Sequence, residues 1–160
     1  MDYQDICNFL YKEARYLDDR QWDEWLECYD EEVEYWMPSW RDDDQPSENP
    51  RTEVSLIYYP NKNGLVDRVF RIKTERSSAS TPEPRTSHNL SNIEVLNQDG
   101  DEAEVRYNFL TMNHRYRETD SFFGTTYVTL SKASGEIKIT KKKIVLKNDY
   151  IRQVIDVYHI

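Results

Sequence analysis

The chain has 160 residues, enough for a single domain, 1–160, that buries roughly 70% of its unfolded surface without disulfide staples. It has only two cysteines, no signal-peptide pattern at its N-terminus and no apolar run near the ~18 residues of a membrane span, so we expect a cytoplasmic protein that binds no membrane. Its 30 acidic and 21 basic residues give a net charge of −9, which would repel phosphate backbones and argues against a nucleic-acid partner.

Two amphipathic helices are predicted at the start of the chain. Residues 2–17 place apolar side chains on one helical face: Tyr3, Ile6, Leu10, Ala14 and Leu17. A second stripe at helical spacing follows: Trp22, Trp25, Leu26 and Tyr29. Asp18 fits the N-cap of this second helix, and Gln21 at its third position would complete a capping box.

The next part of the chain mixes strand, loop and helix. Alternating apolar residues indicate strands, prolines in a polar run indicate a loop, and Leu65, Val69 and Ile72 share one helical face. In chain order we predict a strand at 33–38, a loop at 41–50, a strand at 53–59, a helix at 61–78 and a break at 80–84.

Strands dominate the remainder. We predict four of them, at 87–96, 102–117, 120–132 and 135–148. Turn residues between them favour hairpins, at 98–101, 118–120 and 133–136.

Two of these strands change their apolar face part-way along. In 102–117 the apolar positions shift from Val105, Tyr107 and Phe109 to Leu110, Met112 and Tyr116. In 135–148 they shift from Ile137 and Ile139 to Ile144 and Leu146. Such a phase slip indicates a β-bulge, and bulges bend sheets. Helices followed by a long, strongly curved, mainly antiparallel sheet indicate an α+β cone.

Charge is unevenly distributed along the chain. Residues 1–50 hold 16 acidic and 4 basic residues, a net of −12, whereas residues 136–160 hold 6 basic and 3 acidic residues, a net of +3. Solvated faces of opposite sign are the simpler explanation. A head-to-tail contact between copies, or an acidic face that steers a partner, is the alternative.

No metal or nucleophile signature is present. The three histidines show no i, i+4 pair, and there is no Cys-x-x-Cys, G-x-S-x-G or glycine-rich phosphate loop. His114 and His159 are better explained as structural or surface residues than as ligands. Cys7 and Cys28 are better explained as small buried residues of the two helices.

Acid–base chemistry is the catalytic possibility that the residues leave open. An α+β cone has an open mouth in which a histidine could act as a general base. His88 begins a strand among polar neighbours, and Tyr35, Asp18 and Asp30 could face the same cavity. A hydrogen-bonded, structural His88 at the strand entry explains the same pattern, and on these residues alone we favour it.

Several segments resemble a known family. The segment LDDRQWDEWLECYDEEVEYWMP resembles the entry motif of the NTF2-like (cystatin-like) cone. Five others, in chain order, resemble the small (β) subunit of the benzoate and toluate 1,2-dioxygenases, which are ring-hydroxylating enzymes of the Rieske non-haem iron type: SLIYY, GLVDRVFRIKTERSSA, PRTSHNLSN, DSFFGTTYVTL and VLKNDYIRQVIDVYHI. The resemblance covers essentially the whole chain and is weakest at NQDGDEAEV, a predicted turn and strand entry.

This resemblance implies a supporting role. In the family, the large (α) subunit holds the Rieske [2Fe–2S] cluster, the mononuclear Fe(II) and the substrate pocket, and the small subunit carries no cofactor. It implies an α3β3 hexamer in which small subunits also associate as a trimer, with electrons from NADH arriving through a separate reductase. The implied reaction is O2-dependent cis-dihydroxylation of benzoate-type acids. The resemblance implies that this chain has no catalytic, cofactor-binding or metal-binding residues.

The histidine count agrees with that implication. A Rieske cluster takes two Cys and two His, and a facial-triad iron takes two further His and a carboxylate. The chain has three histidines and therefore cannot hold both centres.

Two functions follow from these observations. The first is a non-catalytic structural subunit of a benzoate 1,2-dioxygenase system, and the second is a stand-alone cone-fold dehydratase or isomerase with His88 as general base. The first predicts iron only on a partner, and the second predicts an open pocket and activity without a partner. Among ring acids, benzoate is preferred, and toluate, halobenzoate and anthranilate stay open.

Overall fold

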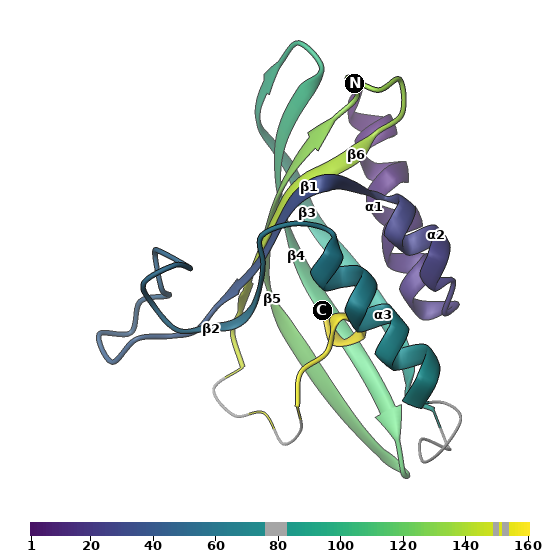
Figure 1. The fold of residues 1–160 in the computed structure, drawn as a ribbon, viewed down its shortest axis with the longest axis vertical. Coiled ribbons are helices and arrows are strands. Elements are labelled where there is room, and N and C mark those ends of the chain that lie inside the picture. The colour runs from purple at the N-terminus through teal and green to yellow at the C-terminus, as the bar shows by residue number, and fades with distance from the viewer. Residues whose placement is uncertain (76–82, 149–150, 152–153) are drawn as a thin grey trace.

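Six strands form one sheet with helices along one of its sides (Figure 1) in the computed structural model, which describes residues 1–75, 83–148, 151 and 154–160. The helical segments are α1 (Tyr3–Asp18), α2 (Trp22–Glu27), α3 (Asn63–Glu75) and a 3-10 turn, η1 (Val157–His159). The strands are β1 (Tyr29–Pro38), β2 (Ser55–Tyr59), β3 (Arg85–Asp99), β4 (Glu102–Arg115), β5 (Glu118–Ser131) and β6 (Lys138–Leu146). Their order across the sheet is β2-β1-β6-β5-β4-β3, and all neighbours are antiparallel except β1 and β6.

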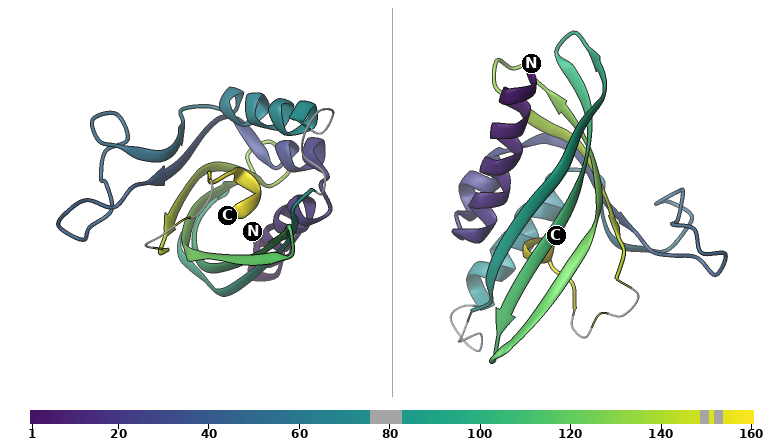
Figure 2. Two further views of the ribbon diagram at one scale, coloured as in Figure 1. Left: turned by 90° about the horizontal axis from the view of Figure 1, so that it is seen from below. Right: turned by 180° about the vertical axis from the view of Figure 1, so that it is seen from behind.

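The sheet curls around the C-terminal turn. Viewed from below, β3 to β6 wrap around η1, and α1, α2 and α3 close the open side of the curl (Figure 2). Register shifts interrupt β3 twice, and Thr140 is an extra residue in β6 between pairs Thr129–Lys141 and Leu130–Ile139. These bulges bend the long strands, so the predicted slip in 135–148 and the α+β cone are both confirmed.

The predicted bulge in 102–117 is wrong. Strand β4 pairs with β5 without a break, and its inward alternation continues from Phe109 to the buried Thr111 and Asn113. Leu110 and Met112 point to the other face and are exposed. The apparent change of apolar face arises because polar residues continue the inner row while apolar residues begin on the outer face.

Helix α1 forms where the periodicity predicts it. A capping box of Asp2 and Asp5 begins the helix, and the apolar stripe from Ile6 to Leu17 is buried. Tyr3, however, is 56% exposed, and its hydroxyl donates to the backbone carbonyl of Ile93. The prediction that Tyr3 shares the buried face is therefore wrong.

The start of the second helix differs from the expectation. Asp18 is the last residue of α1, not an N-cap, and the N-cap of α2 is Gln21, whose side chain makes no capping bond. Arg20 adopts a positive φ of 57°, which separates the two helices. Tyr29 begins β1 instead of ending α2, because the helix stops after Glu27.

The other elements lie close to their predicted positions. The 53–59 strand is β2, and the 61–78 helix is α3, with Leu65, Val69 and Ile72 buried; its predicted end, and most of the predicted break at 80–84, fall outside the described residues. The predicted turn at 118–120 is wrong. The β4–β5 turn is instead Tyr116–Arg117, with positive φ values of 53° and 67°, as in two-residue primed hairpin turns.

Candidate functional site

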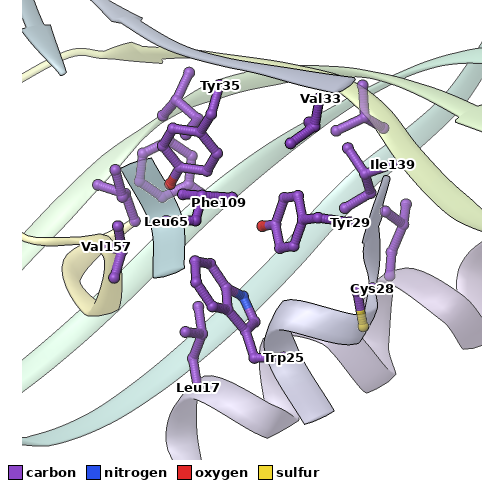
Figure 3. Close-up of a cluster of buried hydrophobic side chains, with 14 of the residues drawn as sticks. Leu17, Trp25, Cys28, Tyr29, Val33, Tyr35, Leu65, Phe109, Ile139 and Val157 are labelled. Carbon is purple, nitrogen blue, oxygen red and sulfur yellow. The ribbon is translucent and has the colours of Figure 1, made fainter. Parts of the chain in front are cut away.

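The inside of the curl is filled by the chain's own C-terminal segment. Val157, His159 and Ile160 are buried there, although Val154 is exposed. Figure 3 shows Val157 meeting Leu65 of α3, with Trp25 and Tyr29 on the far side of the same cluster. The described residues thus place a packed core where a cone-fold enzyme would need space for a substrate.

Asp18 and His88 form a hydrogen-bonded pair at the end of α1. The Asp18 carboxylate lies 2.5 Å from His88 Nδ1 and also accepts from the His88 backbone N–H at 3.0 Å and from Thr86 Oγ1 at 2.9 Å. Since a carboxylate only accepts, Nδ1 carries the proton toward Asp18. The pair therefore joins the C-terminal end of α1 to the first residues of β3.

The environment of the pair favours a structural role. Burial would raise the pKa of Asp18, but hydrogen bonds from His88 and Thr86 outweigh burial and hold that pKa below its usual range. The His88 side chain is only 3% exposed, and its Nε2 has no hydrogen-bond partner among the described residues. The imidazole is thus held against its neighbours inside the fold rather than presented to an open cavity.

His159 lies in the C-terminal segment that fills the curl, residues 154–160, rather than on the surface. Its Nδ1 accepts from the Asp156 backbone N–H at 2.9 Å, and its ring stacks near Phe122 at 4.7 Å between centroids. Burial lowers the pKa of His159 to about 4, against a partial upward effect of Asp156. Arg68 of α3 forms a two-pronged salt bridge with the Asp156 carboxylate and so ties the C-terminal segment to α3.

A second buried ion pair joins α1 to the sheet. Glu13 Oε1 accepts from Lys142 Nζ at 2.9 Å, from the Tyr29 hydroxyl at 2.6 Å and from Trp25 Nε1 at 2.8 Å. Burial would raise the pKa of Glu13, but the Lys142 charge and these three donors lower it. For Lys142, burial acts to lower the pKa and is outweighed by Glu13, which raises it. Both side chains are therefore ionised and matched.

The remaining candidates lie apart from His88 in the structure. Tyr35 packs between Tyr29 and Tyr59, with ring centroids 6.1 and 6.2 Å away, and burial raises its pKa. Asp30 accepts from the Glu32 backbone at the start of β1, and His114 bonds Thr119 on an exposed strand end. The expectation that Tyr35 and Asp30 share a cavity with His88 finds no contact in the described residues.

The cysteines are buried, as expected for packing residues. Cys7 lies in α1, whereas Cys28 lies one residue past α2 rather than inside a helix. Burial raises the pKa of the Cys28 thiol to about 12, so it is protonated and unreactive at neutral pH.

No group of three or more His, Cys, Asp or Glu side chains is placed to hold a metal ion in the part of the chain that is described. No described helix is both long and apolar enough to cross a membrane.

Sequence reasoning missed the two buried ion pairs, Glu13–Lys142 and Arg68–Asp156. Glu13 carried a usable signal, because it lies between Leu10 and Leu17 on the apolar face of α1. Lys142 carried one too, since it continues the inward alternation of β6 after the bulge. Nothing local marks Arg68 and Asp156, which are 88 residues apart.

Comparison with known proteins gives a consistent result. The family model described as "Ring hydroxylating beta subunit" matches residues 12–153. The chain is 57% identical to the toluate 1,2-dioxygenase subunit beta of Pseudomonas putida, over all of this chain and 99% of that one. It is 56% identical to the benzoate 1,2-dioxygenase subunit beta of Acinetobacter baylyi, over 98% and 93% of the two chains.

Solved structures agree in fold. The crystal structure of the beta subunit of the benzoate 1,2-dioxygenase from Burkholderia mallei superposes with a TM-score of 0.88, at 49% identity, over 100% of this chain and 98% of that one. An NTF2-like protein with a cystatin-like fold from Novosphingobium aromaticivorans superposes with a TM-score of 0.64, at 13% identity, over 93% of this chain and 84% of that one, a likeness that shows the fold alone. The predicted NTF2-like cone is confirmed.

Proposed function

The chain belongs to the family of ring-hydroxylating dioxygenase β subunits, and we propose that it serves a benzoate 1,2-dioxygenase system as the small subunit of the terminal oxygenase. It is a structural partner of a catalytic large subunit and not a stand-alone dehydratase or isomerase. The match to the family model over 12–153 carries this conclusion, and the filled interior of the cone supports it.

The proposed reaction is the NADH- and O2-dependent cis-dihydroxylation of a benzoate-type ring acid. Similar identity to a toluate and to a benzoate subunit supports this substrate class. Within the class we propose benzoate. We propose that residues 1–160 form one domain and that the complex works in the cytoplasm.

The proposed assembly is an α3β3 hexamer in which the small subunits also contact one another as a trimer. In it the large subunit carries the Rieske [2Fe–2S] cluster and the mononuclear Fe(II), and a separate reductase delivers electrons. We assign no catalytic, cofactor-binding or metal residue to this chain. Among its described residues the buried charged side chains pair with one another, which supports a structural role for them.

Co-expression with a large oxygenase subunit tests this function. We expect the two chains to purify together, with iron and acid-labile sulfide in proportion to the large subunit. The chain expressed alone should bind neither. Stoichiometric iron on the isolated chain would contradict the proposal.

A variant of His88 separates the structural role from the catalytic one. In the purified oxygenase, His88→Gln should keep the turnover per assembled complex while lowering the melting temperature, because the ring holds α1 to β3. The matched control is His114→Gln on the exposed strand end. Loss of turnover with assembly, iron content and melting temperature all unchanged would show that His88 takes part in chemistry.

A further inference from the structure

The convex face of the sheet has no cover in the described chain. Helices α1, α2 and α3 and the turn η1 all lie on the concave side (Figure 2). The convex side carries large exposed apolar side chains on β4 and β5: Leu110, Met112, Phe123 and Tyr127. Leu110 and Phe123 are cross-strand partners, so the apolar side chains form one patch. Contiguous exposed apolar surface of this kind marks contact sites.

A groove with basic walls lies beside this patch. Arg106, Tyr127 and Lys143 are direct neighbours across β4, β5 and β6, and the Lys143 Nζ lies 4.6 Å from the centre of the Trp36 ring. Together with Lys147 and Pro46 they line a groove of about 470 Å³. We call this the basic groove.

The cations of the groove differ from the two lysines that directly precede Lys143 in β6. Lys141 pairs with Glu34 and Lys142 with Glu13, whereas Arg106, Lys143 and Lys147 make no ion pair with any carboxylate in the described residues. Glu94 lies opposite Arg106 in the register but is exposed and makes no such pair either. A chain of net charge −9 thus keeps three unmatched cations together on one uncovered face.

An arm projects from the body beside the groove. Residues 39–54, between β1 and β2, extend away from the sheet and the helices (Figure 1). This arm contains five acidic and two basic residues. Asp42 and Asp44 are exposed and make no ion pair in the described structure, and Val54 is 74% exposed. The arm therefore combines negative charge with apolar surface, as the groove and patch combine positive charge with apolar surface.

The arm is held in shape mostly by its own hydrogen bonds, and Trp40 Nε1 fixes its base to the body by donating to the Leu146 carbonyl of β6 at 2.7 Å. The Glu53 carboxylate accepts from the backbone N–H groups of Glu48 and Asn49, both at 2.7 Å, and Arg41 bridges Asp43 and Glu53. Ser47 is 1% exposed and donates to the carbonyl of Val54 at 2.9 Å. A pre-shaped projection loses little entropy when it docks.

We propose that the arm of one copy docks on the basic groove and apolar patch of a second copy of this chain. The contact places Asp42 and Asp44 near Arg106, Lys143 and Lys147, and the apolar side of the arm near Leu110 and Phe123. This contact would explain the uneven charge of the sequence, because the acidic segment 1–50 of one copy meets the basic strand β6 of the next. This inference rests on the proposed association of small subunits within the oxygenase.

A second copy suits these surfaces because both halves of the contact lie on the same chain. The two surfaces are different patches, so the contact is head-to-tail. Head-to-tail contacts close into rings when the rotation between neighbours allows it, and three-fold closure gives a trimer. Matching the charges also fixes the register and disfavours other pairings.

Disulfide trapping in the assembled oxygenase tests the contact. Two small subunits with different tags, one carrying Asp44→Cys in the arm and the other Lys147→Cys in the groove, are co-expressed with the large subunit and oxidised. We expect a linked species at twice the 19.3 kDa mass of the subunit, carrying both tags. Native Cys7 and Cys28 are buried and should not interfere. In the control, the second cysteine is placed at an exposed position of α1, as Lys12→Cys, in place of the groove cysteine, and no link should form.

Charge reversal gives an independent measurement. Lys147→Glu should weaken association of small subunits roughly tenfold, measured by the mass of the complex on dilution, since a close charge pair becomes a repulsion. Lys147 lies just beyond β6, so the variant leaves the sheet intact, and the stronger variant Arg106→Glu/Lys147→Glu is a second step. Adding Asp42→Lys/Asp44→Lys should restore the association.

The outcomes separate this inference from the proposed function. A link from the groove cysteine to the large subunit, or no link while the complex keeps its full mass, overturns the arm–groove contact and leaves the subunit role intact. Charge reversal without rescue by the opposite reversal also overturns it. Failure to purify with any large subunit would overturn the proposed function as well.

Discussion

The concave and convex faces of the sheet differ in whether their charged side chains have partners of opposite charge. On the concave side, the ionised Glu13 and Lys142 are almost fully buried and pair with each other. Glu13 also accepts from the Tyr29 hydroxyl and the Trp25 indole, and Lys142 also donates to the Tyr29 hydroxyl oxygen. On the convex side, Arg106 of β4 and Lys143 of β6 lie on either side of Tyr127 in β5, with no carboxylate partner in the described residues. The buried charges of the inner face are thus paired within one chain, and these cations of the outer face are not.

This difference indicates where the function of the chain resides. A cone-fold enzyme keeps reactive groups and space on its inner face, but here the inner face is packed, and its buried ion pairs hold α1 to the sheet and α3 to the C-terminal segment. Unmatched charge and exposed apolar area are instead on the outside. Substitutions on the two faces should therefore affect different properties, stability on the inside and assembly on the outside.

The largest effect should come from breaking the buried ion pair. Lys142→Met leaves the Glu13 carboxylate buried without a counter-charge, which should lower the free energy of unfolding by about 3–5 kcal/mol. Urea unfolding of the purified subunit measures this. The adjacent Lys141→Met breaks only a surface pair with Glu34 and should cost about 0.2–1 kcal/mol. Adding Glu13→Gln to Lys142→Met should recover part of the loss, and equal losses for Lys141 and Lys142 would contradict the comparison.

The next effect should come from the link between α1 and β3. Asp18→Ala removes the acceptor of the His88 ring, the His88 backbone N–H and Thr86 Oγ1, and should cost roughly 2–3 kcal/mol because these partly buried donors lose their partner. Its neighbour Asp19 is exposed, so Asp19→Ala should change stability by less than about 0.5 kcal/mol. If the two variants unfold at the same urea concentration, the pair does not stabilise the fold.

A smaller effect should appear as a pH dependence of stability that arises from His159 in the C-terminal segment. The folded-state pKa of His159 is about 4, against an ordinary value of 6.5, so the unfolded chain takes up a proton below pH 6.5 while the folded chain does not. The stabilisation is thus present above pH 6.5 and is lost as the pH falls toward 4, by about 2 kcal/mol between roughly pH 7.5 and pH 5.

Thermal melts at the two pH values test this dependence. The wild-type melting temperature should fall by roughly 4–8 °C more than that of His159→Asn, whose amide oxygen can replace Nδ1 as acceptor from Asp156. His114→Asn serves as the control for the loss of a histidine, because that side chain lies on an exposed strand end. An unchanged slope in His159→Asn would assign the acid sensitivity to other groups.

The parts of the fold that sequence predicts well are those with local causes. The apolar stripe of α1 and the alternation of β5 and β6 reflect side-chain geometry within one element. The predicted N-cap role of Asp18 is wrong because an aspartate at a helix boundary suits an end of α1 as well as a start of α2. Its actual partner, His88, is 70 residues away, and no local pattern encodes that contact.

Strand β4 shows why the faces of the sheet were harder to predict. Apolar residues are expected to mark the inner face, but Thr111 and Asn113 are buried inside while Leu110 and Met112 lie outside. Burial-based patterning assumes that a chain covers its own apolar surface. A subunit whose outer face awaits a partner breaks that assumption, so the error in β4 coincides with the patch that we assign to docking.

The smallest effect on stability should come from the outer face, and strand β5 provides a matched pair of phenylalanines. Phe122 points inward and is 3% exposed, whereas Phe123 points outward and is 46% exposed. Phe122→Ala should cost the isolated subunit about 3–5 kcal/mol through a cavity beside His159, but Phe123→Ala less than about 0.5 kcal/mol. In the assembled oxygenase the order of importance should change, because Phe123→Ala removes apolar contact between subunits. Urea unfolding of the subunit measures its stability, and the mass of the complex on dilution measures its assembly. A Phe123→Ala variant that assembles as tightly as wild type would show that the patch is ordinary solvated surface and not a contact site.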